Sequence, residues 1–299
     1  MRELILHIGT HKTGTTTVQA ALAASADQLL RQYGLLYPAT GRPQSKFECR
    51  FGHHFLATSL SRAAGVEQPG VWTDFLEECE RSSAERVLVS AEYFSSLKPD
   101  QIARLNQLVS GFERVSVILY LRNPVRFLLS AYRQQTNGHR AIACNFEQFV
   151  IENVARCDYE NLVCNWAGIF GPNSLKVRVF DYVVSSDDLL ADFARSTGLP
   201  AIPNMDGLHL NASSSLGVTR IISVLNNLQK WFPHRPLHTL KRVILQSRLN
   251  QLELLDQLIG TSITSRSVQL IHETFQMEKA AELRRFLIPE EMNCLRVHD

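Results

Sequence analysis

The segment 6-LHIGTHKTGTTTVQAAL-22 decides the fold of the first part of the chain. It opens within the short apolar run 4–8, which ends at Gly9 and is typical of a buried parallel strand. After the loop 9–16, apolar residues recur at helical spacing at Val18, Ala21, Leu22, Leu29 and Leu30. A glycine-rich turn between a strand and a helix directs backbone N–H groups outward. The segment therefore predicts an anion site suited to phosphate.

The side chains of this loop add charge and hydrogen-bond donors. Lys12 supplies a full positive charge, and hydroxyl groups come from Thr13, Thr15, Thr16 and Thr17. Gly9 and Gly14 have the spacing of the nucleotide-triphosphate loop G-x-x-x-x-G-K-[ST], but Thr15 stands where that loop has its lysine. This departure disfavours a triphosphate–magnesium site and leaves a 5′-phosphate group as the expected ligand. The alternative is a threonine-rich helix cap without a ligand.

Further along the chain, strands are expected to alternate with helices. Strand patterns occur at 34–38, 86–90, 115–121 and 175–180, with helical patterns at 54–60, 72–79, 102–108, from 127 onward and at 188–198. This alternation predicts an α/β fold with a parallel sheet flanked by helices. From residue 211 onward only helical stripes occur, at Ile221, Ile222, Leu225 and Leu228 and at Leu249, Leu252, Leu255 and Ile259. We interpret 1–299 as a single domain, with an α/β nucleotide-binding core over 1–200 and a helical extension over 211–299. The intervening stretch 200–215 is interpreted as a long loop.

Composition excludes several classes of protein. The 299 residues are 45% hydrophobic and 20% charged, which favours a globular fold over a disordered chain. A net charge of +2 lacks the large excess of positive charge that is typical of nucleic-acid-binding proteins. No apolar run reaches the roughly 18–20 residues of a membrane helix, and no export signal is found, so we expect a cytoplasmic protein. The six cysteines form no C-x-x-C pair, which favours free thiols and no metal site.

A second motif, 119-LYLRNPVRFLLSAYRQQ-135, follows the strongest strand pattern. Arg122 comes at the end of that strand, and its guanidinium fork suits phosphate oxygens. Pro124 suits a helix start, and Ser130 lies on the helix that follows. The alternative for Arg122 taken alone is a salt bridge at the end of the strand.

Together, the two motifs resemble those of the sulfotransferase family. The 5′-phosphosulfate loop of that family has the pattern K-[ST]-G-[ST]-[ST], here 12-KTGTT-16, and its second signature is an arginine with a serine eight residues later, here Arg122 and Ser130. The resemblance covers roughly residues 1–200, and the two motifs lie about 110 residues apart. It implies a P-loop NTPase-like sulfotransferase fold that takes 3′-phosphoadenosine 5′-phosphosulfate (PAPS) as donor, releases 3′-phosphoadenosine 5′-phosphate (PAP) and requires no metal.

The same resemblance implies roles for single residues. Lys12 should contact the bridging oxygen and stabilise the leaving phosphate, while Thr15 and Thr16 with backbone N–H groups hold the 5′-phosphate. Arg122 and Ser130 should bind the 3′-phosphate. The other residues expected to line the donor pocket are His11, Thr13, Gly14 and Thr17. The Arg-Lys-Gly segment that completes the 3′-phosphate site in the cytosolic branch is absent, which leaves that part unidentified and favours a bacterial or glycan-type branch.

A hydroxyl acceptor needs a general base. The first candidate is Glu92, just past the strand at 86–90, at the edge of the sheet where ligands bind in such folds. The alternative for Glu92 is a carboxylate at a helix start or on the surface. His53 and His54 are the rival bases, and His7 is interpreted as structural. The sequence leaves the choice among Glu92, His53 and His54 open.

The leading hypothesis is a PAPS-dependent sulfotransferase of the EC 2.8.2 type. It would move a sulfuryl group in line to a hydroxyl or amine of a saccharide, a lipid-linked glycan or a secondary metabolite. The alternatives are a P-loop kinase acting on a small molecule and a non-catalytic nucleotide-binding module. Acceptor contacts are expected from the loops 39–75 and 135–165 and from the C-terminal helices. The apolar stripe within 242–260 is interpreted as packed on the core, with a membrane-surface helix and a homodimer contact as the alternatives.

Overall fold

The computed structural model describes residues 2–43, 51–61, 70–138, 140–199, 201–202, 216–231, 237–246, 264–275 and 280–297. The chain divides into two compact units. Unit 1 comprises Met1–Arg122, Tyr159–Leu210 and Glu278–Leu295, and unit 2 comprises Asn123–Asp158, Asn211–Met277 and Arg296–Asp299. The interpretation of 1–299 as one domain, with a core over 1–200 and an extension over 211–299, stays a prediction.

Unit 1 is built on a parallel sheet of five strands in the order β2-β3-β1-β4-β5. The strands are β1 (Glu3–His7), β2 (Leu35–Leu36), β3 (Arg86–Ser90), β4 (Arg114–Leu121) and β5 (Leu175–Val179). In the middle of the sheet, Leu6 of β1 lies in register with Val89 of β3 and Val117 of β4. Every strand pair is parallel, so the predicted α/β class with a parallel sheet is confirmed.

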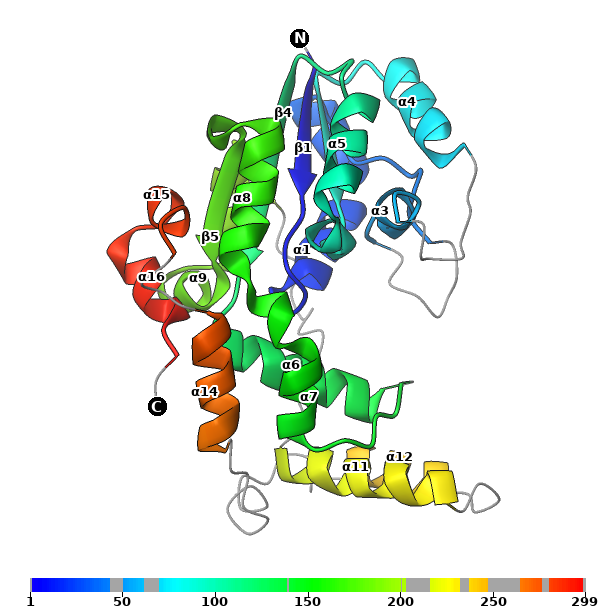
Figure 1. Ribbon diagram of the computed structural model, residues 1–299. Helices are drawn as coiled ribbons and strands as arrows, with labels where there is room; N and C mark the ends of the chain where they lie inside the picture. The colour runs from blue at the N-terminus through cyan, green and yellow to red at the C-terminus, as the bar shows by residue number, and fades with distance from the viewer. Residues whose placement is uncertain are drawn as a thin grey trace. The chain divides into compact units, whose positions relative to one another are not determined.

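Helices cover the sheet of unit 1 (Figure 1). They are α1 (Thr15–Ala24), α2 (Ala26–Tyr33), α3 (His54–Thr58), α4 (Val71–Arg81), α5 (Pro99–Leu108), α8 (Tyr159–Phe170), α9 (Phe180–Ser186), α10 (Leu189–Thr197), α15 (Leu283–Phe286) and α16 (Pro289–Leu295), with 3₁₀ turns η2 (Glu92–Ser96) and η4 (Pro172–Ser174). Ile5, Leu88 and Ile118 pack with α1, α2 and α10 in one buried core. Their strand neighbours Leu4 and Leu6 are also buried and face the opposite side, because side chains alternate along a strand. Both faces of the sheet are therefore covered, as parallel sheets require.

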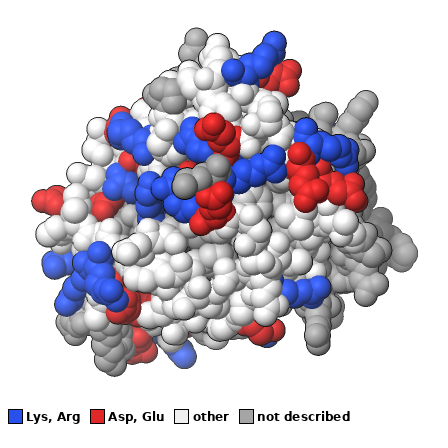
Figure 2. All heavy atoms as spheres, turned by 90° about the horizontal axis from the view of Figure 1, so that it is seen from above, with Lys and Arg blue, Asp and Glu red and all other residues white. Residues whose placement is uncertain are grey.

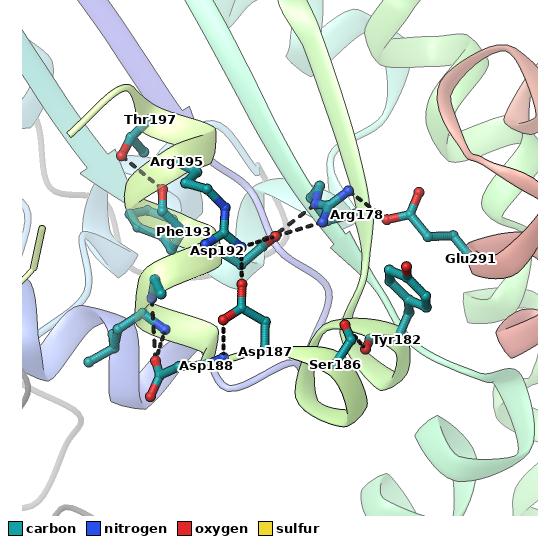
Figure 3. Close-up of polar contacts among 12 residues, drawn as sticks. Arg178, Tyr182, Ser186, Asp187, Asp188, Asp192, Phe193, Arg195, Thr197 and Glu291 are labelled. Carbon is teal, nitrogen blue, oxygen red and sulfur yellow. Dashed lines mark hydrogen bonds and ion pairs between the residues drawn. The ribbon is translucent and has the colours of Figure 1, made fainter. Parts of the chain in front are cut away.

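The C-terminal helix α16 is tied to β5 by buried charges. Arg178 of β5 lies between Asp192 of α10 and Glu291 of α16 (Figure 3). Its Nη2 and Nε donate to both oxygens of Asp192 over 2.6 and 3.2 Å, and its Nη1 donates to Glu291 Oε1 over 2.7 Å. Tyr120 Oη completes the cluster with a hydrogen bond of 2.6 Å to Asp192 Oδ2. The chain segment at 278–295 thus belongs to the sheet unit rather than to the helical one.

In its described residues, unit 2 is helical. It contains α6 (Pro124–Asn137), α7 (Phe146–Asn153), the 3₁₀ turn η3 (Val154–Cys157), α11 (Leu216–Trp231), α12 (Leu237–Gln246) and α14 (Ser265–Thr274). Asn123 caps α6 by accepting from the backbone N–H groups of Val125 and Arg126. Asn226 of α11 donates to the carbonyls of Thr136 and Ile142, which ties α11 to α6 and its following loop. The predicted stripe at Leu249, Leu252, Leu255 and Ile259 lies outside the described residues, as does 203–215 of the predicted long loop.

Surface charge follows the near balance of the composition. On the face that Figure 2 shows, Lys and Arg side chains lie interspersed with Asp and Glu. No helix within the described ranges is both long enough and apolar enough to cross a membrane.

Candidate functional site

The loop between β1 and α1 has a backbone that depends on glycine. Gly14 precedes α1 with φ 72° and ψ 14°, the left-handed region that side chains disfavour. A Cβ on Gly14 would overlap Leu189 Cδ2 and lie 3.1 Å from Phe180 Cε2. A Cβ on Gly9 would lie 2.9 Å from His7 Nε2. These close approaches explain why both positions carry no side chain. The loop ends at the first turn of α1, whose first backbone N–H groups have no partner within the helix.

Two threonine hydroxyls hold the loop together from inside. Thr13 Oγ1 donates to the carbonyl of Thr10 over 2.6 Å, and Thr10 Oγ1 donates to the carbonyl of Tyr120 over 2.9 Å. Both side chains are buried, so the hydroxyl hydrogen of Thr13 is already used within the protein. Thr16 and Thr17, at the start of α1, are half-buried, and Thr15 is 5% exposed. Of the hydroxyl donors expected from the sequence, Thr13 is therefore engaged inside the loop. The backbone N–H groups and the hydroxyls of the first turn of α1 are the donors that could face an anion.

Lys12 and Arg122 meet at this loop. Lys12 has a left-handed backbone with φ 69°, which is rare for a residue with a side chain. Its carbonyl accepts a hydrogen bond of 2.7 Å from Arg122 Nη1, which fixes this conformation. Burial lowers the pKa of the Lys12 amine, and the positive charge of Arg122 lowers it further, while Glu92 acts in the opposite direction. Two cations side by side are an arrangement that an anion would stabilise.

Arg122 is itself positioned by the start of α9. Its guanidinium carbon lies 5.3 Å from the ring centroid of Phe180, and its Nε lies 4.0 Å from Asp181 Oδ1. Its carbonyl accepts a hydrogen bond of 2.7 Å from Tyr159 Oη. Arg122 is therefore held at its backbone and at its side chain, and its contact with Asp181 is the kind of ion pair that the alternative interpretation expects at the end of the strand.

Glu92 lies at the start of η2, directly past β3, with its side chain 17% exposed. Its Oε2 accepts a hydrogen bond of 3.2 Å from Gln19 Nε2. Oε1 lies 4.0 Å from His11 Nδ1, and Oε2 lies 4.0 Å from His54 Nδ1. The ring of Tyr93 packs edge-on against the rings of both histidines. Unit 1 thus brings Glu92, His54 and His11 together, next to the loop that carries Lys12.

The two neighbouring histidines differ in their surroundings. His53 is fully buried, and its Nδ1 accepts from the backbone N–H of Ser90 over 3.1 Å. Nε2 therefore carries the proton and donates to the carbonyl of Pro38 over 3.0 Å. Burial lowers the pKa of His53 to about 3. With both ring nitrogens occupied and no exposed surface, His53 is a poor general base, whereas His54 faces Glu92 and stays a candidate.

His7 has a structural place, as the sequence predicts. It is 1% exposed at the end of β1, and its Nδ1 shares a hydrogen bond of 2.8 Å with Ser90 Oγ. Burial lowers the pKa of His7 to about 4, so the imidazole is neutral at physiological pH.

The remaining expected donor residue, Ser130, lies on α6 of unit 2 and is half-buried. Its place beside the 3′-phosphate stays a prediction. Two residues near Glu92 and Arg122 were missed by the sequence reasoning: Gln19 and Asp181. Gln19 left a signal, because it is a long polar side chain among the mostly apolar buried residues of α1. Asp181 left none, because Arg122, its neighbour in space, is distant in sequence.

No protein-family model and no curated protein matches the chain. The chain is similar to the crystal structure of a sulfotransferase from Alicyclobacillus acidocaldarius, with a TM-score of 0.46 and 14% identity over 88% of this chain and 97% of that one. It is also similar to the sulfotransferase domain from the curacin biosynthetic pathway, with a TM-score of 0.42 and 10% identity over 91% of this chain and 97% of that one. Both are sulfotransferases, the family that the two motifs resemble.

Proposed function

We propose that this protein is a sulfotransferase that takes its sulfuryl group from PAPS and releases PAP. The observation that carries the proposal is the contact between the two motifs: Arg122 Nη1 donates to the carbonyl of Lys12 over 2.7 Å. Motifs about 110 residues apart thereby join two cations and the N-terminus of α1 at one end of the sheet. This set of donors has the chemistry that a nucleotide with phosphate groups at both its 3′ and 5′ positions requires.

In this proposal each residue of the donor site has a defined task. The N–H groups at the start of α1 and the hydroxyls of Thr15 and Thr16 would hold the 5′-phosphate. Lys12 would neutralise the charge that grows on the leaving phosphate as the sulfur–oxygen bond breaks, which is the larger part of catalysis in such transfers. Arg122, with Ser130, would bind the 3′-phosphate. His11, Thr13, Gly14 and Thr17 complete the pocket by shaping the loop.

Glu92 is the general base of the proposal. When an acceptor hydroxyl forms its new bond to sulfur, its proton would pass to the Glu92 carboxylate. His11 and His54 stand 4.0 Å from the two oxygens of this carboxylate. The acceptor class that we propose is a hydroxyl or amine of a saccharide, a lipid-linked glycan or a secondary metabolite.

A thermal-shift comparison tests the donor class. The purified protein is melted alone and with PAP, with AMP, and with ATP plus magnesium, since a ligand that binds only the folded state raises the melting temperature. We expect a clear rise with PAP and little change with the other two. A rise with ATP plus magnesium alone would replace the proposal by a P-loop kinase, for which the Gly9 and Gly14 spacing is the one favourable feature.

A further inference from the structure

Gln19 is a buried amide in the middle of α1, the helix that begins at the phosphate-binding loop. It is fully buried, with 0% of its surface exposed. Burying a polar side chain is unfavourable unless its hydrogen bonds are made, and fixing a glutamine also costs rotamer entropy. A hydrophobic residue would fill this position of the helix at less cost. The contacts of the amide should therefore explain why a glutamine occupies this position.

The amide nitrogen of Gln19 joins two residues at the end of β3. It donates to Glu92 Oε2 over 3.2 Å and to Ser90 Oγ over 3.1 Å. The backbone of Gly52 lies against the amide, because a Cβ at that position would lie 2.7 Å from both Nε2 and Oε1 of Gln19. The amide plane is thus clamped by a glycine on one side and by two acceptors on the other, so its orientation is defined.

The same contacts continue under the phosphate-binding loop. Ser90 Oγ shares a hydrogen bond of 2.8 Å with His7 Nδ1, and the carbonyl of His7 accepts from the backbone N–H of Ala91 over 3.0 Å. His7 Nε2 lies directly beneath Gly9. A chain of buried polar groups therefore runs from the underside of the loop, through Ser90 and Gln19, to the carboxylate of Glu92.

We propose that Gln19 is a positioning residue for Glu92: its amide holds Oε2 and leaves Oε1 to take the proton of the acceptor. This inference rests on the proposed function, since it assigns Gln19 a part in the same transfer. In this proposal Gln19 touches no reacting atom and affects the transfer through Glu92. The ionisable groups that face Glu92 come from the loop before α1, from β1, from α3 and from η2 itself: His11, Lys12, His7, His54 and Tyr93.

The first test needs neither donor nor acceptor. The Glu92 side-chain carboxyl is observed by carbon-13 NMR at one pH in wild type, in Gln19→Met and in Gln28→Met, with Glu92→Gln to assign the signal. Methionine keeps the length of glutamine and removes the donor, so the chemical shift of the Glu92 carboxyl carbon should change in Gln19→Met. Gln28, exposed on α2, makes its side-chain bond to Gln32 and serves as the matched control with an unchanged chemical shift. Equal chemical shifts in wild type and Gln19→Met would overturn the proposal.

The second test uses radiolabelled PAPS with a pool of monosaccharides and phenols as acceptors. Gln19→Met should lower kcat by about 10- to 100-fold, while KM for PAPS stays within about 2-fold. In a Glu92→Gln background the same substitution should change the residual rate by less than about 2-fold, because the carboxylate that Gln19 positions is gone. Additive losses, or a rise in the KM for PAPS with an unchanged kcat, would assign Gln19 a merely structural role.

Two further outcomes keep the tests separable. If Gln19→Met does not fold, Gln19→Asn keeps an amide but withdraws it from Glu92 by one methylene, and it should change the chemical shift of the Glu92 carboxyl carbon in the same direction; an unchanged shift overturns the proposal. If the wild type shows no rise of melting temperature with PAP, the proposed function fails. The NMR comparison still reports whether Gln19 controls Glu92.

Discussion

Asp192 and Glu291 contact Arg178 at 2.6 and 2.7 Å, whereas both ion pairs of Glu92 span 4.0 Å. Both groups of carboxylates lie in unit 1, against strands of one sheet. In the first group Arg178 meets Asp192 with two donors, and Tyr120 adds a third hydrogen bond (Figure 3). In the second, Glu92 accepts a hydrogen bond of 3.2 Å from Gln19 and has two histidines at longer range.

This difference separates stability from chemistry. A carboxylate whose lone pairs are filled by close donors has little left to offer a ligand. A carboxylate with long contacts to ionisable groups keeps an oxygen available for a proton, and catalytic hydrogen bonds often tighten only when the substrate is bound. The Arg178 cluster joins α10 and α16 to β5, whereas the Glu92 cluster is the one to which the proposed function gives a part in transfer.

The largest expected effect comes from replacing Glu92 by glutamine, and it is compared with the same replacement of Glu291. Glu92→Gln should lower kcat by about 10²- to 10⁴-fold, because the base is removed while the shape is kept. Its melting temperature and its response to PAP should match those of wild type. Glu291→Gln should do the opposite, lowering the melting temperature and sparing transfer per folded molecule. The assay is label transfer from PAPS beside a melting curve, and an active Glu92→Gln variant would break the comparison.

Next in size is the loss of the buried partner of Arg178. Asp192→Asn should lower the free energy of unfolding by about 3–5 kcal/mol, because it leaves a half-buried guanidinium without its bidentate carboxylate. Denaturant unfolding measures this change. Asp187→Asn removes the exposed partner of Arg195 and should give a far smaller loss. An equal loss of unfolding free energy in both variants would show that burial of the carboxylate does not decide how much its ion pair stabilises the fold.

A smaller effect is expected from a side chain added to the backbone of the loop 9–16, the proposed phosphate-binding loop between β1 and α1. Gly14→Ala should cost about 2–3 kcal/mol of unfolding free energy, because a side chain meets both a left-handed φ and the Leu189 side chain. It should also weaken PAP binding by displacing the loop. Gly171→Ala is the matched control: its φ is 85°, but a Cβ there would meet nothing within 4 Å. Normal PAP binding by Gly14→Ala, seen in calorimetric titration, would contradict the place of the ligand.

The smallest effect concerns acid stability. Burial lowers the pKa of His53 from its ordinary value of 6.5 to about 3, so the unfolded chain binds more protons than the folded protein between these two values. The free energy of unfolding should therefore fall by about 1 kcal/mol per pH unit on acidification below pH 6.5 through this residue. Glu291 acts with the opposite sign, because burial raises its pKa. Urea unfolding at pH 7.5 and 5.5 should show a shallower loss in His53→Gln, and identical losses would refute the buried neutral imidazole.

The sequence was sufficient for the parts of the structure that repeat locally. Short apolar runs predict all five strands of the sheet, and the loop 9–16 with Lys12 lies where its pattern places it, between β1 and α1. The candidate site was harder, because its contacts join distant segments. That Arg122 would hold the carbonyl of Lys12, or that Gln19 would reach Glu92, depends on the register of β1, β3 and β4. The choice between His53 and His54 depends on burial, which adjacent residues of the same type do not reveal.

Lys12 gives the most direct test of the account. Wild type and Lys12→Ala are compared for transfer of radiolabel from PAPS to a pool of saccharide and phenol acceptors, at equal concentrations of folded protein. The account predicts that the variant keeps the melting temperature of wild type and loses transfer by about 10²- to 10³-fold, as expected when a charge that stabilises the leaving group is removed. Transfer by Lys12→Ala at the wild-type rate would contradict it.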